Sequence, residues 1–138
     1  MGWRDITNAT NERTVIASVL PRAGVGHKRP LFFTSKKEYL RACKLANMNC
    51  LAFDFIARTK LGGTDLTYAY LKQLPVLSPE AYSPNELAFI IPRVFALTYT
   101  AYDIAGWAED LWNSLDTNIR ARVYRRSQLE DNYYRRMS

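Results

Sequence analysis

The sequence contains few of the residues from which metal sites and catalytic triads are built. Its 138 residues include one histidine and two cysteines, so a zinc site would need unusual ligands. The histidine, His27, has no cysteine near it in the sequence, and we interpret it as a loop residue. The pattern Gly-x-Ser-x-Gly does not occur either, which leaves a serine hydrolase without support.

Long hydrophobic runs are also missing. No apolar run reaches the roughly 18 to 20 residues of a membrane-spanning helix, and the N-terminus lacks the apolar region of a signal peptide. We therefore expect a cytoplasmic protein that makes no membrane contact. In that compartment Cys43 and Cys50 should stay reduced, and because they lie in a helical pattern we predict that both are core residues.

The charge is unevenly distributed along the chain, whose net charge is +6. Residues 1–60 contain eleven lysines and arginines against four acidic residues, residues 61–116 two against seven, and residues 117–138 six against two. A basic surface attracts polyanions such as nucleic acids, and an acidic stretch can pack against basic protein. A soluble protein with an ordinary charge dipole is the alternative interpretation.

Three short stretches in the first half of the chain have strand patterns. Residues 14–20 are β-branched and apolar, residues 30–34 resemble them, and residues 74–77 contain a proline that suits the edge of a sheet. Each is predicted as a strand. The link between the first two, residues 22–29, is predicted as an exposed basic loop.

Two helices are predicted in the same half. Ser35 and Glu38 have the spacing of a capping box, which indicates a helix beginning at Ser35. A second helix is predicted over residues 50–60, and we expect the glycine pair Gly62 and Gly63 to end it.

The second half of the chain has the patterns of helices alone. Residues 78–84 are the clearest linker, after which Ser83 and Glu86 form a second capping box for a helix that begins at Pro84. Pro92 is expected to interrupt this helix. The aromatic residues that follow are predicted to pack a helix face and not to stack on bases: Phe95, Tyr99, Tyr102, Trp107 and Trp112.

The predicted fold class is α+β, a small sheet packed by helices and followed by an all-helical C-terminal extension. The apolar content of 48%, with 13% aromatic residues, is sufficient for a folded core. We predict two domains, residues 1–79 and residues 80–138. The last predicted helix, residues 118–136, has a stripe of Ile119, Val123 and Tyr124 among arginines.

Four motifs occur in an order that resembles one protein family. In chain order they are Arg-Thr-Val-Ile-Ala-Ser-Val-Leu-Pro-Arg at residues 13–22, Arg-Thr-Lys-Leu-Gly-Gly-Thr-Asp-Leu-Thr at 58–67, Leu-Thr-Tyr-Thr-Ala-Tyr-Asp-Ile-Ala at 97–105 and Ala-Glu-Asp at 108–110. The chain is similar here to the C-terminal, target-recognition part of large adenine-specific DNA methyltransferases of bacterial restriction-modification systems. The resemblance implies a role in DNA binding beside a methyltransferase domain that uses S-adenosylmethionine.

The chain itself lacks the motifs of catalysis. It has no Pro-Pro pair for an adenine-binding loop, no glycine-rich turn for S-adenosylmethionine, and no Glu-x-Lys or Asp-x-Lys of a metal-dependent nuclease. We therefore expect neither an enzyme nor a cofactor site in this chain, and we predict that it positions duplex DNA for a catalytic domain it does not contain.

Phosphate binding needs cations, hydroxyls and accessible backbone amides. The residues predicted to contact DNA are Arg13, Arg22, Lys28, Arg29, Arg58, Lys60, Gly63 and Thr64. A structural role is the alternative for the helix end, because Arg58 can pair with Asp54 four residues earlier. For the whole chain, the alternatives are a module that docks on the methyltransferase or another protein without touching DNA, and an independent protein unrelated to methylation.

Overall fold

The structure is a computed structural model that describes the backbone of residues 1–137 and the side chains of residues 1–128. It contains two compact units: the first comprises Met1–Ser35 and Lys44–Leu77, and the second comprises Lys36–Cys43 and Ser78–Ser138. The second unit thus resumes close to the predicted domain boundary after residue 79, but the inclusion of Lys36–Cys43 in it was not predicted.

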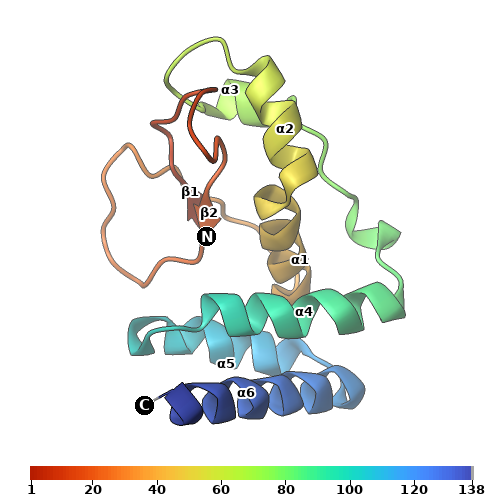
Figure 1. The fold of residues 1–138 in the computed structure, drawn as a ribbon. Coiled ribbons are helices and arrows are strands. Elements are labelled where there is room, and N and C mark those ends of the chain that lie inside the picture. The colour runs from red at the N-terminus through yellow and green to blue at the C-terminus, as the bar shows by residue number, and fades with distance from the viewer. Residues whose placement is uncertain (138) are drawn as a thin grey trace. The chain divides into compact units, whose positions relative to one another are not determined.

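The predicted fold class is confirmed, since a two-stranded sheet is followed by helices in the second half (Figure 1). Residues 1–7 form backbone hydrogen bonds with several other segments of the first unit. β1 (Gly2–Trp3) pairs antiparallel with β2 (Ala17–Ser18), and further backbone hydrogen bonds join residues 1–7 to the segments 30–32 and 64–66. The N-terminus is therefore built into the core of the first unit.

The strand predicted over residues 14–20 is much shorter in the structure, where only Ala17–Ser18 pair as a strand. The cause is a side chain. The amides of Thr14 and Val15 donate to one carboxylate oxygen of Asp54, at 2.9 and 2.7 Å, instead of to a neighbouring strand.

The other two strand predictions are wrong. Residues 30–34 contribute one isolated bridge, at Leu31. The amide of Phe32 instead donates to the carbonyl of Met1 at 2.7 Å. Residues 74–77 pair with no strand, because the amide of Leu74 continues a turn by donating to the last residue of α3 (Tyr68–Leu71).

α1 (Glu38–Asn49) begins three residues later than predicted. The side chain of Glu38 pairs with Arg41 at 2.6 Å and does not reach back to Ser35. Within the second unit, the hydroxyl of Ser114 accepts a hydrogen bond from the Tyr39 amide at 3.2 Å. A residue distant in sequence therefore caps the first turn of α1.

α2 (Leu51–Lys60) agrees with the predicted helix. It ends before the glycine pair, because the amide of Leu61 closes the last turn on the carbonyl of Ala57 at 2.9 Å. Neither Gly62 nor Gly63 has a positive φ, and a Cβ at Gly63 would meet no atom within 4 Å. The prediction that these glycines end the helix is wrong, since nothing in their conformation requires glycine.

The two cysteines differ in environment, although both are free. Cys43 is buried as predicted, and burial raises the pKa of its thiol to about 11. Cys50 is exposed, contrary to prediction, because it is the N-cap of α2 and its sulfur accepts from the Phe53 amide at 3.4 Å.

We expect brief treatment of the folded protein with iodoacetamide to modify Cys50 and to spare Cys43. The thiolate is the reactive form, and at Cys43 both access and ionisation are suppressed by burial. Peptide mass spectrometry measures the two sites separately. Repeating the reaction in urea should label both, and equal labelling of both in the folded protein would contradict this assignment.

In the second unit, η1 (Pro79–Ala81) precedes α4 (Pro84–Thr98). The predicted capping box is present: Ser83 accepts from the Glu86 amide at 3.4 Å, and the Glu86 carboxylate accepts from the Ser83 amide at 2.8 Å. Because both groups lie within one turn, the sequence alone predicts this start.

α4 runs through Pro92 without a break, so the predicted interruption is wrong. A proline inside a helix removes one amide donor and crowds the preceding turn. Here Ala88, Ile91, Pro92 and Val94 are buried and α4 packs along α6 (Thr117–Met137), so tertiary packing maintains the helix.

η2 (Tyr102–Ile104) and α5 (Ala105–Ser114) complete this unit. The ring of Phe95 lies 5.5 Å from that of Tyr99 and 6.3 Å from that of Trp107, as expected for a packing face. Tyr102 does not belong to this face, because it is 93% exposed.

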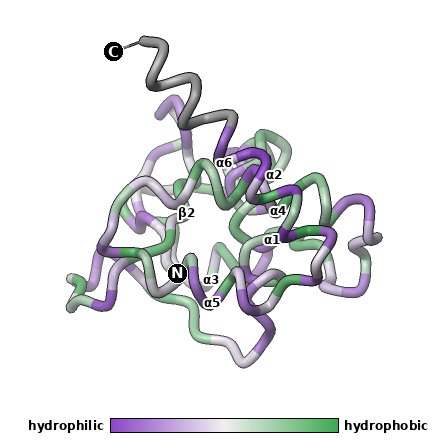
Figure 2. The backbone as a smooth tube through the Cα atoms, turned by 90° about the horizontal axis from the view of Figure 1, so that it is seen from below, coloured by the Kyte–Doolittle hydropathy of each residue, from purple (hydrophilic) through white to green (hydrophobic). Residues whose placement is uncertain are grey.

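Hydrophilic and hydrophobic stretches alternate along the chain (Figure 2), as expected for helices with one buried face. On α6, Ile119 and Val123 are buried, whereas Tyr124, predicted in the same stripe, is exposed. The side chains of the predicted helix from residue 129 onward lie outside the described residues. No described helix has the length and apolar character needed to cross a membrane.

Candidate functional site

The basic loop, residues 22–29, is exposed at every position, as predicted. Lys28 attaches it to the rest of the first unit. Its ammonium group lies 2.7 Å from a carboxylate oxygen of Asp65 and 3.4 Å from one of Asp5. The hydrogen bond to Asp65 raises the pKa of Lys28, and the same bond lowers the pKa of Asp65. Lys28 therefore has a structural role, because its two ion pairs hold the basic loop to Asp5 and Asp65.

The other two cations of the basic loop, Arg22 and Arg29, are exposed. Among the side chains that the structure describes, neither forms an ion pair. Their guanidinium groups are therefore available to an external anion, and a guanidinium suits a phosphate because it can donate two parallel hydrogen bonds.

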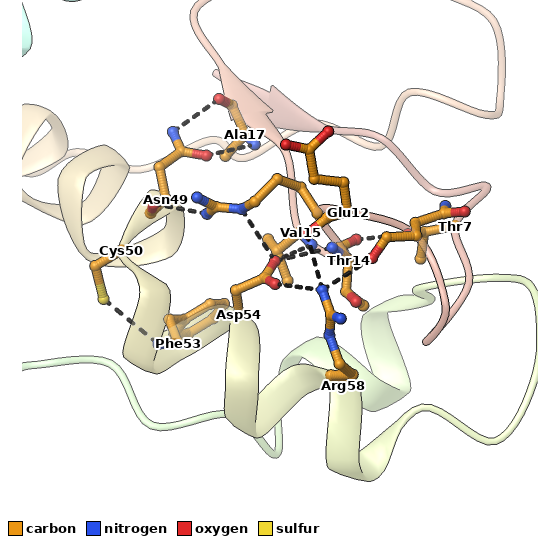
Figure 3. A network of polar contacts seen from close by, with 12 residues as sticks. Thr7, Glu12, Thr14, Val15, Ala17, Asn49, Cys50, Phe53, Asp54 and Arg58 are labelled. Carbon is orange, nitrogen blue, oxygen red and sulfur yellow. Dashed lines mark hydrogen bonds and ion pairs between the residues drawn. The ribbon is translucent and has the colours of Figure 1, made fainter.

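Arg13 and Arg58 converge on Asp54, a carboxylate that is only 4% exposed. Figure 3 shows the side chain of Arg58 directed at this carboxylate. Arg13 lies 3.4 Å from one oxygen of Asp54 and donates to the carbonyl of Asn49 at 2.7 Å. Arg58 lies 3.2 Å from the other oxygen, the pairing that the spacing of four residues permits. Arg58 also donates to the carbonyl of Glu12 at 2.9 Å.

The partners of Asp54 keep it ionised. Burial raises its pKa, but the Val15 amide, the charge of Arg13 and the hydrogen bond from Arg58 together hold the pKa below its ordinary value. Arg13 and Arg58 are therefore committed to an internal network, which leaves them less free for an external phosphate than the exposed arginines of the basic loop.

The end of α2 and the following turn are arranged differently. Lys60 is exposed, and no described acidic side chain pairs with it. The hydroxyl of Thr64 donates to the carboxylate of Asp65 at 3.3 Å. The backbone carbonyl of Thr64 accepts from the Thr7 amide at 2.9 Å. The structure thus brings Thr64 and Lys28 together on Asp65, and Gly63 lies in open space beside them.

A cavity of about 430 Å³ adjoins the basic loop. Sequence reasoning missed it, because its lining comes from three separate stretches of the chain. The residues that line it are Asp5, Val25, Gly26, His27, Arg29, Pro30, Leu31, Thr67 and Tyr68. The only histidine of the chain thus lines a hollow together with Arg29, which has no ion pair among the described side chains.

Asn49 has a structural role that the sequence did not predict. Its side-chain amide accepts from the amide of Ala17 at 3.0 Å and donates to the carbonyl of Ala17 at 2.9 Å (Figure 3). It thereby continues the hydrogen bonding of β2 with a side chain. No local pattern could have identified it, since the two residues are 32 positions apart.

Comparison of the chain with protein-family models, with curated proteins and with solved structures finds no match. Among the described side chains, no three histidine, cysteine or acidic groups are placed to hold a metal ion. The chemistry that the first unit offers is exposed cations, hydroxyl groups and a partly apolar hollow.

Proposed function

We propose that the chain binds duplex DNA without catalysing a reaction. The observation that carries the proposal is the pair of exposed arginines, Arg22 and Arg29, on a loop that Lys28 ties to two carboxylates. Fixing a loop lowers the entropy lost when its cations bind, so the arginines can contribute more to affinity. Phosphates of the DNA backbone are the polyanion that such cations neutralise.

The predicted contact residues take different roles in this proposal. Arg22, Arg29 and Lys60 neutralise phosphates, and Gly63 with Thr64 forms a surface that a backbone can approach. The remaining three, Arg13, Lys28 and Arg58, hold the first unit in shape through the carboxylates they pair with. Contacts of this kind position the protein on DNA and carry no sequence information by themselves.

The resemblance of the sequence to methyltransferases supports a wider proposal. In our proposal the chain is the C-terminal, target-recognition part of a cytoplasmic restriction-modification enzyme, and it positions DNA for an adenine-specific methyltransferase domain. S-adenosylmethionine belongs to that domain. The absence of catalytic motifs from the sequence supports this assignment of DNA positioning to the chain and of methyl transfer to the other domain.

A salt titration of duplex binding by the whole chain tests the proposal. We expect weak binding that falls steeply as salt rises, because phosphate contacts release counterions. Arg29→Ala and Lys60→Ala should each weaken binding to all duplex sequences and reduce the salt slope by about one. Both side chains are exposed, so thermal stability should hardly change.

Lys72→Ala is the matched control, since it removes one exposed cation of the first unit that is outside the proposed surface. Its salt slope should equal that of the unmodified chain. Binding that is flat between low and physiological salt, or a loss with Lys72→Ala as large as with Arg29→Ala, would refute phosphate recognition by the proposed residues.

Docking on another protein is the second candidate function. It is favoured by Phe89 and Leu97 on α4, which are 58% and 79% exposed in the acidic part of the chain. They lie eight residues apart and therefore share one helix face. Under this alternative, Leu97→Ser would abolish association with a methyltransferase domain, while duplex DNA would not bind the chain at any salt concentration.

A further inference from the structure

The cavity beside the basic loop is the feature that the proposed duplex binding leaves unused. Its volume of about 430 Å³ lies within the roughly 300–1,000 Å³ typical of small-molecule sites. Three segments of the first unit enclose it: the stretch that follows β1, the basic loop with residues 30 and 31, and the start of α3. It is an open hollow and not a sealed void, so a ligand can enter it.

One wall of the cavity is apolar and held in place. The ring of Tyr68 meets Trp3 edge-on at 4.7 Å, and its hydroxyl donates to the carbonyl of Leu31 at 2.9 Å. Tyr68 is nevertheless 48% exposed, which leaves part of it open to the cavity. Val25 and Pro30 extend the apolar lining. Such a wall suits a flat, aromatic body.

The polar groups of the lining favour a ligand that also carries an anion. Arg29 has no described ion-pair partner, and the side chain of Thr67 caps no backbone amide of α3. His27 adds a ring nitrogen that can donate or accept. The carboxylate of Asp5 is already paired with Lys28, which offsets its repulsion of an anion.

We infer that this cavity binds a nucleotide, with the phosphate on Arg29 and the base against Tyr68, Val25 and Leu31. A phosphate joined to an aromatic base combines the two properties of the lining. Arginine recognises phosphate by paired hydrogen bonds, and aromatic side chains bind bases of any sequence through their faces. A free mononucleotide and an unpaired nucleotide within a strand share this chemistry.

The single histidine provides a direct measurement, because its imidazole signals in a nitrogen–proton NMR spectrum can belong only to His27. Titrating the full chain with adenosine 5′-monophosphate should shift these signals and saturate. Arg29→Ala should weaken the apparent affinity about tenfold or more, since a charge-assisted contact is lost. Lys72→Ala is the control: this exposed cation of the first unit neither lines the cavity nor belongs to the proposed DNA surface, so the affinity should not change.

Two further titrations test the parts of the ligand. Adenosine without phosphate and inorganic phosphate alone should each shift His27 more weakly than the nucleotide does. A short single-stranded oligonucleotide that saturates the same signals would identify an unpaired nucleotide as the source, whereas saturation by the mononucleotide alone would identify a free one.

No saturable shift with any of these nucleotides would overturn the inference. So would inorganic phosphate that binds as tightly as the nucleotide, because the cavity wall would then recognise no base. The salt titration of duplex binding is read separately, and Lys60→Ala should affect only that measurement. Failure of the cavity and failure of the proposed duplex surface are therefore distinguishable.

Discussion

Replacing Asp54 with alanine is expected to lower the free energy of unfolding by about 3–5 kcal/mol. The substitution removes the acceptor for the fully buried amides of Thr14 and Val15 and leaves Arg13 and Arg58 without their carboxylate. Chemical unfolding followed by circular dichroism measures the change. A loss of this size would show that Asp54 holds the N-terminal segment against α2.

Two other variants calibrate this expectation. Asp54→Asn keeps an oxygen acceptor but loses the charge, so its effect should lie between those of the unmodified chain and Asp54→Ala. Asp65→Asn breaks the more exposed pair with Lys28, and for such pairs we expect about 1 kcal/mol or less. If Asp54→Ala cost no more than Asp65→Asn, the buried network would not have the structural role assigned to it.

The same carboxylate makes stability depend on pH. Because its pKa in the folded chain lies below its ordinary value, the ionised form is favoured by folding. This contribution is complete above the unfolded-state pKa of about 4 and is lost as the pH falls through the lower folded-state pKa. The difference in unfolding free energy between the unmodified chain and Asp54→Asn should therefore shrink in acid.

Trp3→Ala is expected to cost about 3–5 kcal/mol of unfolding free energy, the range for removing a large buried aromatic residue. Trp3 is fully buried, its indole donates to the carbonyl of Leu66 at 2.7 Å, and its ring lies 4.7 Å from those of Phe32 and Tyr68. The substitution leaves a cavity and a carbonyl without its donor. Denaturant unfolding again measures the loss.

Trp3→Phe separates these two terms, because it fills part of the space but cannot donate to Leu66. Its cost should be smaller than that of alanine and still above about 1 kcal/mol. Tyr102→Ala is the exposed aromatic control, with an expected change within about 0.5 kcal/mol. A Trp3→Ala variant as stable as Tyr102→Ala would show that the N-terminal segment does not belong to the stabilising core.

The residues predicted to bind DNA illustrate how far local patterns reach. The pairing of Arg58 with Asp54 could be anticipated, since the two lie four residues apart on one helix. The second arginine on the same carboxylate could not, because Arg13 lies far from Asp54 along the chain. The sequence shows which positions carry a positive charge. Only the fold decides whether such a side chain already forms an ion pair with a carboxylate of the same protein.

The cavity shows the same limit at the level of a site. His27 was interpreted as a loop residue, and it does lie in an exposed loop. Only the folded chain brings Thr67 and Tyr68 to the same hollow as His27. The spacing of these residues along the chain does not predict that they line one cavity.

The sequence by itself determined the features that a single turn of chain decides: the start of α4 at the Ser83 capping box, the extent of α2 and the exposure of the basic loop. Their partners lie within a few residues, so composition and spacing are sufficient. Tertiary structure decided the rest. β2 is short because the Val15 amide donates to Asp54, and the first turn of α1 is capped by Ser114. α4 continues past Pro92 because its buried face is packed. Each outcome depends on a group that only folding brings near.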